Sequence, residues 1–225
     1  MNFGPLHRRG GRYALAAVLL CAAVARPAAA QIPSAHDLAQ RVDKHYNQLH
    51  SLKAGFEESY QGLGIQRAES GTLLLLKPGR MRWDYTSPKG KLFLLDGKYA
   101  WFYTQGDPQA QRIPAKQLDD LRSPLRFLLG HTELEKELGH IAAAPAGPGL
   151  FTLTGQPKGL EQRVARLSIT ATAEGVITRI EIEETGNAIT RFIFTGEQTN
   201  APIPPNTFRF EPPAGVAVID SLPPV

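Results

Sequence analysis

The sequence is almost free of cysteine, and its single copy, Cys21, lies near the N-terminus. Residues 31–225 therefore carry no thiol, which excludes disulfide bonds, thiolate metal ligands and a cysteine nucleophile there. Long hydrophobic runs are also missing, because no stretch after residue 30 approaches the roughly 20 apolar residues of a membrane-spanning helix.

An excess of charge of one sign is absent as well. The formal net charge of +4 comes from four arginines in residues 1–30, and the other 21 basic side chains are matched by 21 acidic ones. A neutral chain is a poor partner for a polyphosphate backbone or an anionic membrane surface. We therefore expect no nucleic-acid partner.

Signatures of catalysis are missing too. The sequence contains no GxSxG elbow, no glycine-rich phosphate loop and no HExxH motif. The adjacent carboxylates Glu57-Glu58 and Glu183-Glu184 would point to opposite faces of a strand, which makes them poor candidates for a cooperating acid and base. We expect no enzyme activity, no metal and no cofactor.

Residues 1–30 have the pattern of a cleaved secretory signal peptide. A basic start with Arg8, Arg9 and Arg12 precedes a short apolar stretch, and the small residues Ala28-Ala29-Ala30 precede Gln31. This pattern predicts a bacterial periplasmic protein whose residues 31–225 form a single domain.

The segment from Gly71 to Tyr103 predicts a β-meander. Turn signals at Lys77-Pro78-Gly79, Ser87-Pro88-Lys89-Gly90 and Asp96-Gly97 divide it into four pieces of strand length. Alternation places Met81, Trp83 and Tyr85 on one face. So much bulky apolar surface needs either a thick core or a ligand to cover it.

The rest of the chain completes an α+β fold. A helix is expected after Ser34 and Asp37, with short helices between Leu118 and Leu138 that are interrupted at Pro124 and Gly130. Ala142 to Gly149 is expected to be a loop. Strands are expected at Phe56–Tyr60, Ile65–Leu76, Gln111–Ile113, Phe151–Thr154, Val164–Thr170, Val176–Glu183 and Ala188–Thr195, with an extended piece at Thr207–Phe210. These elements predict a single strongly curved antiparallel sheet whose concave side is closed by the N-terminal and central helices.

Three segments in register resemble the periplasmic outer-membrane lipoprotein carrier family, LolA. They are the meander, the Ser123-Pro124-Leu125 to Gly130 segment, and the ending Phe208 to Val216, FRFEPPAGV. The resemblance implies an unclosed β-barrel with a helical lid over an apolar cavity that takes lipoprotein acyl chains. It also implies a monomer that receives its cargo from an inner-membrane ABC-type exporter and passes it to an outer-membrane receptor lipoprotein.

The resemblance also suggests roles for single residues. Lys77 occupies the position of a basic residue, usually arginine, that holds the lid closed by bonding to helix backbone groups. Met81 occupies the position of a residue that contacts the exporter. A lysine ammonium lacks the planar fork of arginine, which implies a weaker latch. The candidates for lining the cavity are Leu75, Trp83, Leu125, Leu128 and Leu129.

Two other functions fit the same sequence. One is a sensor of lipids or lipoproteins built on the same fold, and the other is a hydrolase with a site assembled from scattered carboxylates. Recovery of a bound acyl ligand would favour the carrier, whereas turnover that is lost on changing one carboxylate would favour the hydrolase.

Overall fold

The computed structural model describes residues 1–2, 4, 32–118 and 133–220. Contacts divide the chain into two units, Met1–Ala30 and Gln31–Val225, and the fold described below is that of the second. The predicted signal peptide, apart from three residues, and the lid residues Leu125, Leu128 and Leu129 lie outside the described residues. Among the described helices, none is long and apolar enough to cross a membrane.

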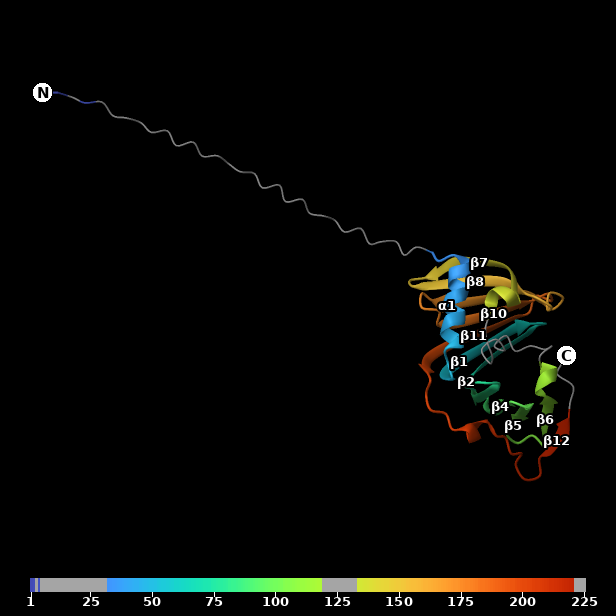
Figure 1. The fold of residues 1–225 in the computed structure, drawn as a ribbon. Helices are drawn as coiled ribbons and strands as arrows, with labels where there is room; N and C mark the ends of the chain where they lie inside the picture. Colours follow the sequence, from blue (N-terminus) through green and yellow to red (C-terminus); the bar gives the residue numbers. More distant parts are fainter. Residues whose placement is uncertain (3, 5–31, 119–132, 221–225) are drawn as a thin grey trace. The chain divides into compact units, whose positions relative to one another are not determined.

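One mixed but almost wholly antiparallel sheet of 12 strands dominates the described residues, as predicted (Figure 1). The spatial order is β12-β6-β5-β4-β3-β2-β1-β11-β10-β9-β8-β7, and only the β12–β6 pair is parallel. The strands are β1 (Ser51–Gly62), β2 (Ile65–Leu76), β3 (Arg80–Ser87), β4 (Lys89–Asp96), β5 (Tyr99–Thr104), β6 (Gln109–Pro114), β7 (Leu138–Gly147), β8 (Leu150–Pro157), β9 (Val164–Thr172), β10 (Ile177–Glu184), β11 (Ile189–Thr199) and β12 (Ala217–Asp220). Because β12 and β7 are its two edges, the sheet is not closed.

The predicted meander is confirmed as strands β2 to β5. Its turns fall at the three predicted signals, and Met81 and Trp83 are buried on one face of β3. On the opposite face Arg82 forms an ion pair with Asp84, with Nε 2.7 Å from Oδ2. The period-two pattern of this segment therefore predicted the correct faces.

The N-terminal helix is confirmed as α1 (Ala35–Asn47). The Ser34 hydroxyl accepts a hydrogen bond from the Asp37 backbone N–H at 3.0 Å and so caps the first turn. One apolar stripe, formed by Leu38, Ala39, Val42 and Tyr46, is buried against the sheet. Gly175, with φ +91°, lets the β9–β10 turn approach the Arg41 backbone, since a Cβ there would lie 2.3 Å from the Arg41 oxygen.

The expected loop at Ala142 to Gly149 is wrong, because most of it belongs to edge strand β7. Ala142, Ala143 and Ala144 pair in register with Thr154, Leu153 and Thr152 of β8. Main-chain pairing does not need large side chains, and proline is tolerated on an edge strand, as at Pro145. Only the turn around Gly147 and Gly149 agrees with the prediction.

The expected extended piece at Thr207–Phe210 is wrong for its first two residues, whereas Arg209 is extended. Pro205–Phe208 form a short 3-10 helix, η3, and the ring of Phe210 then packs 5.3 Å from that of Trp101. Strand β12 follows and was not predicted. Of the short helices expected between Leu118 and Leu138, one is seen near the end of that stretch as α2 (Leu134–Glu137), and residues 119–132 lie outside the described residues. A 3-10 helix, η1 (Ala115–Leu118), ends where the stretch begins.

Both faces of the meander are covered. The face that carries Phe56, Trp83 and Phe192, here called the inner face, forms one large core with α1. On the other face Leu92, Leu94 and Trp101 form a smaller cluster with Tyr99 and Phe210. Part of the meander's apolar surface is thus explained by the C-terminal segment, and the candidate site lies on the inner face.

Candidate functional site

The centre of the inner face is a set of five aromatic rings, here called the aromatic wall. It comprises Phe56 of β1, Trp83 and Tyr85 of β3, and Phe192 and Phe194 of β11. The Phe56 ring lies 4.5 Å from that of Trp83 and 5.0 Å from that of Tyr85, in edge-to-face contacts. Phe192 lies 5.6 Å from Trp83. Such flat rings give a broad apolar surface with few specific bonds.

The described candidates for lining a cavity lie next to this wall. Leu75 and Trp83 are both buried in the core, 3% and 4% exposed, and Leu75 faces Met81 across the β2–β3 pair. Met81 itself is fully buried. An exporter could reach Met81 only after the elements that cover it have moved, so its partner role stays a prediction.

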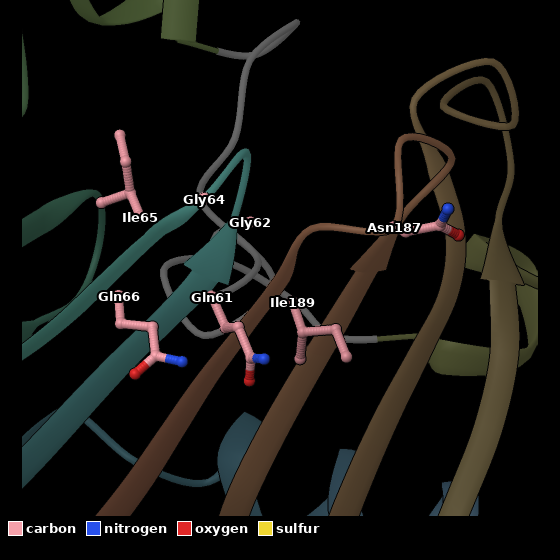
Figure 2. A pocket seen from close by; sticks show the side chains of 7 residues that line it. All are labelled: Gln61, Gly62, Gly64, Ile65, Gln66, Asn187 and Ile189. Carbon is pink, nitrogen blue, oxygen red and sulfur yellow. The ribbon is translucent and has the colours of Figure 1, made fainter.

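Two hollows in the described part lie away from Leu75 and Trp83. One, of about 510 Å³, is lined by residues around the β1–β2 hairpin and the β10–β11 turn, including Gln61, Gln66 and Asn187 (Figure 2). Another, of about 300 Å³, includes Glu57, Ser59 and Arg191. Neither contains Leu75 or Trp83. In this conformation Phe56, Trp83 and Phe192 of the aromatic wall are buried, so an apolar ligand would have to displace the groups packed against them.

Lys77 contacts the helix that the resemblance implicates. Its Nζ donates a hydrogen bond to the Tyr46 backbone oxygen at 2.7 Å, near the C-terminal end of α1. Carbonyls of a last helical turn lack intrahelical donors, and a cation there also meets the favourable end of the helix dipole. Partial burial lowers the pKa of the Lys77 ammonium. The latch role itself stays a prediction.

A second polar group of side chains joins the same end of α1 to the sheet. The Tyr46 hydroxyl donates to Glu197 at 2.9 Å and accepts from the Ile177 N–H at 3.1 Å. His45 Nε2 lies 2.7 Å from the other Glu197 oxygen. Burial and the nearby Glu197 raise the pKa of Tyr46 above its ordinary range, so the phenol stays neutral. Sequence reasoning missed this cluster, because its members are about 150 residues apart.

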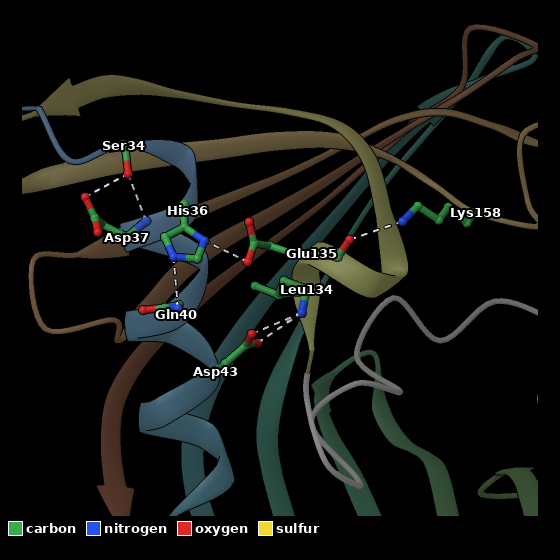
Figure 3. Close-up of polar contacts among 8 residues, drawn as sticks. All are labelled: Ser34, His36, Asp37, Gln40, Asp43, Leu134, Glu135 and Lys158. Carbon is green, nitrogen blue, oxygen red and sulfur yellow. Dashed lines mark hydrogen bonds and ion pairs between the residues drawn. The ribbon is translucent and has the colours of Figure 1, made fainter.

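Elsewhere α1 is joined to α2 (Figure 3). The Asp43 carboxylate accepts from the Leu134 N–H at 3.2 Å, and His36 Nδ1 lies 2.9 Å from Glu135. Hydrogen bonding to Glu135 raises the pKa of His36. Lys158 Nζ donates to the Glu135 backbone oxygen at 3.1 Å. The helix is thus attached by a few polar contacts together with its apolar stripe.

A group of four charged side chains and one tyrosine, here called the charged network, borders the aromatic wall. It consists of Glu58, Arg67, Glu69, Tyr85 and Lys91. Burial, and then the nearby Glu69, raise the pKa of Glu58. Sequence reasoning used Glu58 only to argue against catalysis. The missed signal is strand alternation, which places Glu58 on the same face as Phe56.

No group of three His, Cys, Asp or Glu side chains is arranged to hold a metal ion within residues 32–118 and 133–220. The chemistry that the described inner face offers is apolar contact beside a small set of paired charges. This arrangement suits binding of an amphipathic molecule.

Comparison with known proteins agrees with this geometry. The family model "Outer membrane lipoprotein carrier protein LolA" matches residues 47–211. An outer-membrane lipoprotein carrier protein of Proteus mirabilis is 31% identical over 187 residues, which cover 82% of this chain and 89% of the relative. One of Nitrosospira multiformis is also 31% identical, over 69% of this chain and 74% of the relative. The structure of an uncharacterized conserved protein from Thermus thermophilus shares the fold, with a TM-score of 0.51 at 14% identity over 83% of this chain and 99% of that one.

Proposed function

Because this chain belongs to the LolA family of outer membrane lipoprotein carrier proteins, we propose that it carries lipoproteins by covering their acyl chains with its inner face. The observation that supports this most directly is the aromatic wall, a broad apolar surface that belongs to the same hydrophobic core as the apolar stripe of α1. The sensor and hydrolase alternatives are not favoured, since the relatives are named as carriers.

The energies of binding and opening are comparable. An acyl chain of roughly 15 methylenes gains about 12 kcal/mol on leaving water, at ~0.8 kcal/mol per methylene. Displacing α1 would expose Leu38, Val42 and Tyr46, at a cost of about 6 kcal/mol if each contributes ~2 kcal/mol. The gain from one acyl chain can therefore offset the exposure of the apolar stripe of α1.

This balance also favours release. A site that exchanges one apolar cover for another holds its cargo only until a partner offers a better apolar surface. We place this exchange in the periplasm, after removal of residues 1–30, with residues 31–225 acting as one monomeric carrier domain. The donor would be an inner-membrane ABC-type exporter and the acceptor an outer-membrane receptor lipoprotein.

The two tryptophans allow a direct test. Trp83 belongs to the aromatic wall, whereas Trp101 lies in the cluster on the opposite face. A fatty acyl probe brominated in mid-chain should quench the fluorescence of the Trp101→Phe protein, whose remaining tryptophan is Trp83. The matched Trp83→Phe protein, which retains Trp101, should be quenched little, because bromine quenches at short range.

Equal quenching of the two single-tryptophan proteins would mean non-specific adsorption and would contradict the proposed site. If neither single-tryptophan protein is quenched at probe concentrations that load a known carrier of this family, acyl binding by the inner face is refuted.

A further inference from the structure

The inner face changes from apolar to charged within two residues of the aromatic wall. Along β1, Glu58 follows Phe56 on the same face, and it lies directly opposite Glu69 of β2. Like charges in such a cross-strand pair repel each other. Both carboxylates are nevertheless nearly buried, with 12% and 5% of their side chains exposed.

Two cations compensate this repulsion from the solvent side. Arg67 Nε lies 3.3 Å from Glu69, its guanidinium is 3.8 Å from Glu58, and Lys91 is paired with Glu69. Arg67 is 51% exposed and Lys91 31%. From the Phe56 ring outward, the order is therefore aromatic rings, then the two carboxylates, then the Arg67 guanidinium, with Lys91 at the side next to Tyr85.

Tyr85 connects the two regions. Its ring lies 5.0 Å from that of Phe56, while its hydroxyl donates to Glu58 at 3.2 Å. The Lys91 ammonium lies 4.3 Å from the centre of the same ring. Tyrosine is suited to such a border, since one end of its side chain is apolar and the other polar.

Stability alone is a weak reason for this network. A buried ion pair costs desolvation free energy, and apolar residues of similar volume would often be at least as stable. The position of the network at the edge of a surface that takes acyl chains suggests a role in binding. Arg67 has five N–H donors and Lys91 three, more than the two carboxylates occupy through the contacts above.

We propose that the charged network is the polar end of the cargo site, where Arg67 and Lys91 donate hydrogen bonds to the ester and amide carbonyls that link the acyl chains to the lipoprotein. This inference rests on the proposed carrier function. The acyl chains then lie on the aromatic wall and the polypeptide leaves past the two cations. The network thus sets the depth and direction in which the cargo is held.

The test compares two synthetic lipopeptides with the same peptide and the same chain length. One carries its two chains through ester bonds on a glycerol-cysteine head, and the other carries them through ether bonds, which lack the carbonyls. The wild-type protein should bind the ester form about tenfold more tightly, the effect of one charge-assisted hydrogen bond. Arg67→Met and Lys91→Met should each reduce this ratio towards one, with affinity for the ether form changed less than twofold.

Arg191→Met is the matched control. Arg191 forms an equivalent cross-strand ion pair with Glu181, 2.6 Å apart, but on the other face of β11 from Phe192. The Arg191→Met protein should keep the tenfold ratio of affinities. If circular dichroism shows that Lys91→Met has lost its fold, the half-exposed Arg67→Met decides the test.

Two results overturn the inference while leaving the carrier function intact. They are equal binding of ester and ether forms by the wild type, and an unchanged ratio in the folded Arg67→Met protein. Failure of the wild type to bind either lipopeptide would instead contradict the carrier function itself.

Discussion

At the residue scale, Glu58 shows how a single side chain on the inner face responds to its surroundings. Its carboxylate is nearly buried, opposite Glu69, and its pKa is raised above 4.5 mainly by burial. Such a carboxyl group stabilises the folded protein fully at pH values below its pKa in the unfolded chain. The stabilisation is lost as the pH rises through its pKa in the folded protein.

The direction of this pH dependence leads to a prediction for Glu58→Gln, which places a neutral side chain of the same shape in the charged network. The free energy of unfolding of the variant should exceed that of the wild type at pH 8, and the difference should shrink towards pH 4, where Glu58 is protonated. Urea unfolding at the two pH values measures it. Glu57→Gln, on the opposite face and exposed, is the control. Identical pH profiles for the two variants would contradict the assigned cause.

At the element scale, α1 is the part of the described structure whose attachment matters most for function. Its apolar stripe contributes most of the burial, while Lys77, Glu197 and Asp43 supply polar contacts along its length. Because each net hydrogen bond contributes only about 1 kcal/mol, no single contact locks the helix. We therefore expect the polar contacts to adjust how often α1 opens, and the apolar stripe to decide whether the helix docks.

Lys77 provides the test at this scale. Lys77→Met should remove the bond to the Tyr46 carbonyl and raise the rate of amide hydrogen exchange in α1 by about five- to tenfold, equivalent to ~1 kcal/mol. Lys77→Arg should slow exchange, since a guanidinium can bind more than one carbonyl.

The same pair of variants separates uptake from release. We expect Lys77→Met to change the rate of acyl transfer to an acceptor more than the rate of loading. Equal changes in both rates, or α1 exchange rates that are the same in the two variants, would count against a latch.

At the scale of the whole molecule, the centre of the inner face is buried in this conformation, and we expect α1 to move away from the sheet when cargo binds. His45 and Glu197 offer a place to prevent that movement, since their side chains meet at 2.7 Å between α1 and β11. Residues 31–225 contain no cysteine, which makes introduced thiols there unambiguous.

We predict that His45→Cys combined with Glu197→Cys, in a Cys21→Ser background, loses acyl binding when a short, reducible cross-linker joins the two thiols. Quenching of Trp83 by the brominated probe measures binding. Reduction of the linker should restore it, and each single-cysteine protein treated with the same reagent is the control. Full binding by the cross-linked protein would show that the cargo enters without displacement of α1 from β11.

Strand and turn positions could be predicted well from the sequence, because alternation and turn residues act over a few neighbouring positions. The meander turns at Lys77, Ser87 and Asp96 and the helix after Ser34 are examples. Strand β7 was missed, since its alanines pair through the main chain and carry little side-chain signal. The charged network was missed because it joins side chains from four strands.

What the sequence by itself determined about this protein is therefore local: where strands begin and end, which side chains share a face, and the family resemblance carried by three segments. Only the tertiary structure decided which faces are covered and by what. It placed Phe210 against one face of the meander, joined the other face and α1 in one core, and brought Glu58 opposite Glu69. The physical reason is that alternation and turn chemistry depend on adjacent residues, whereas burial and charge pairing depend on contacts between segments far apart in the chain.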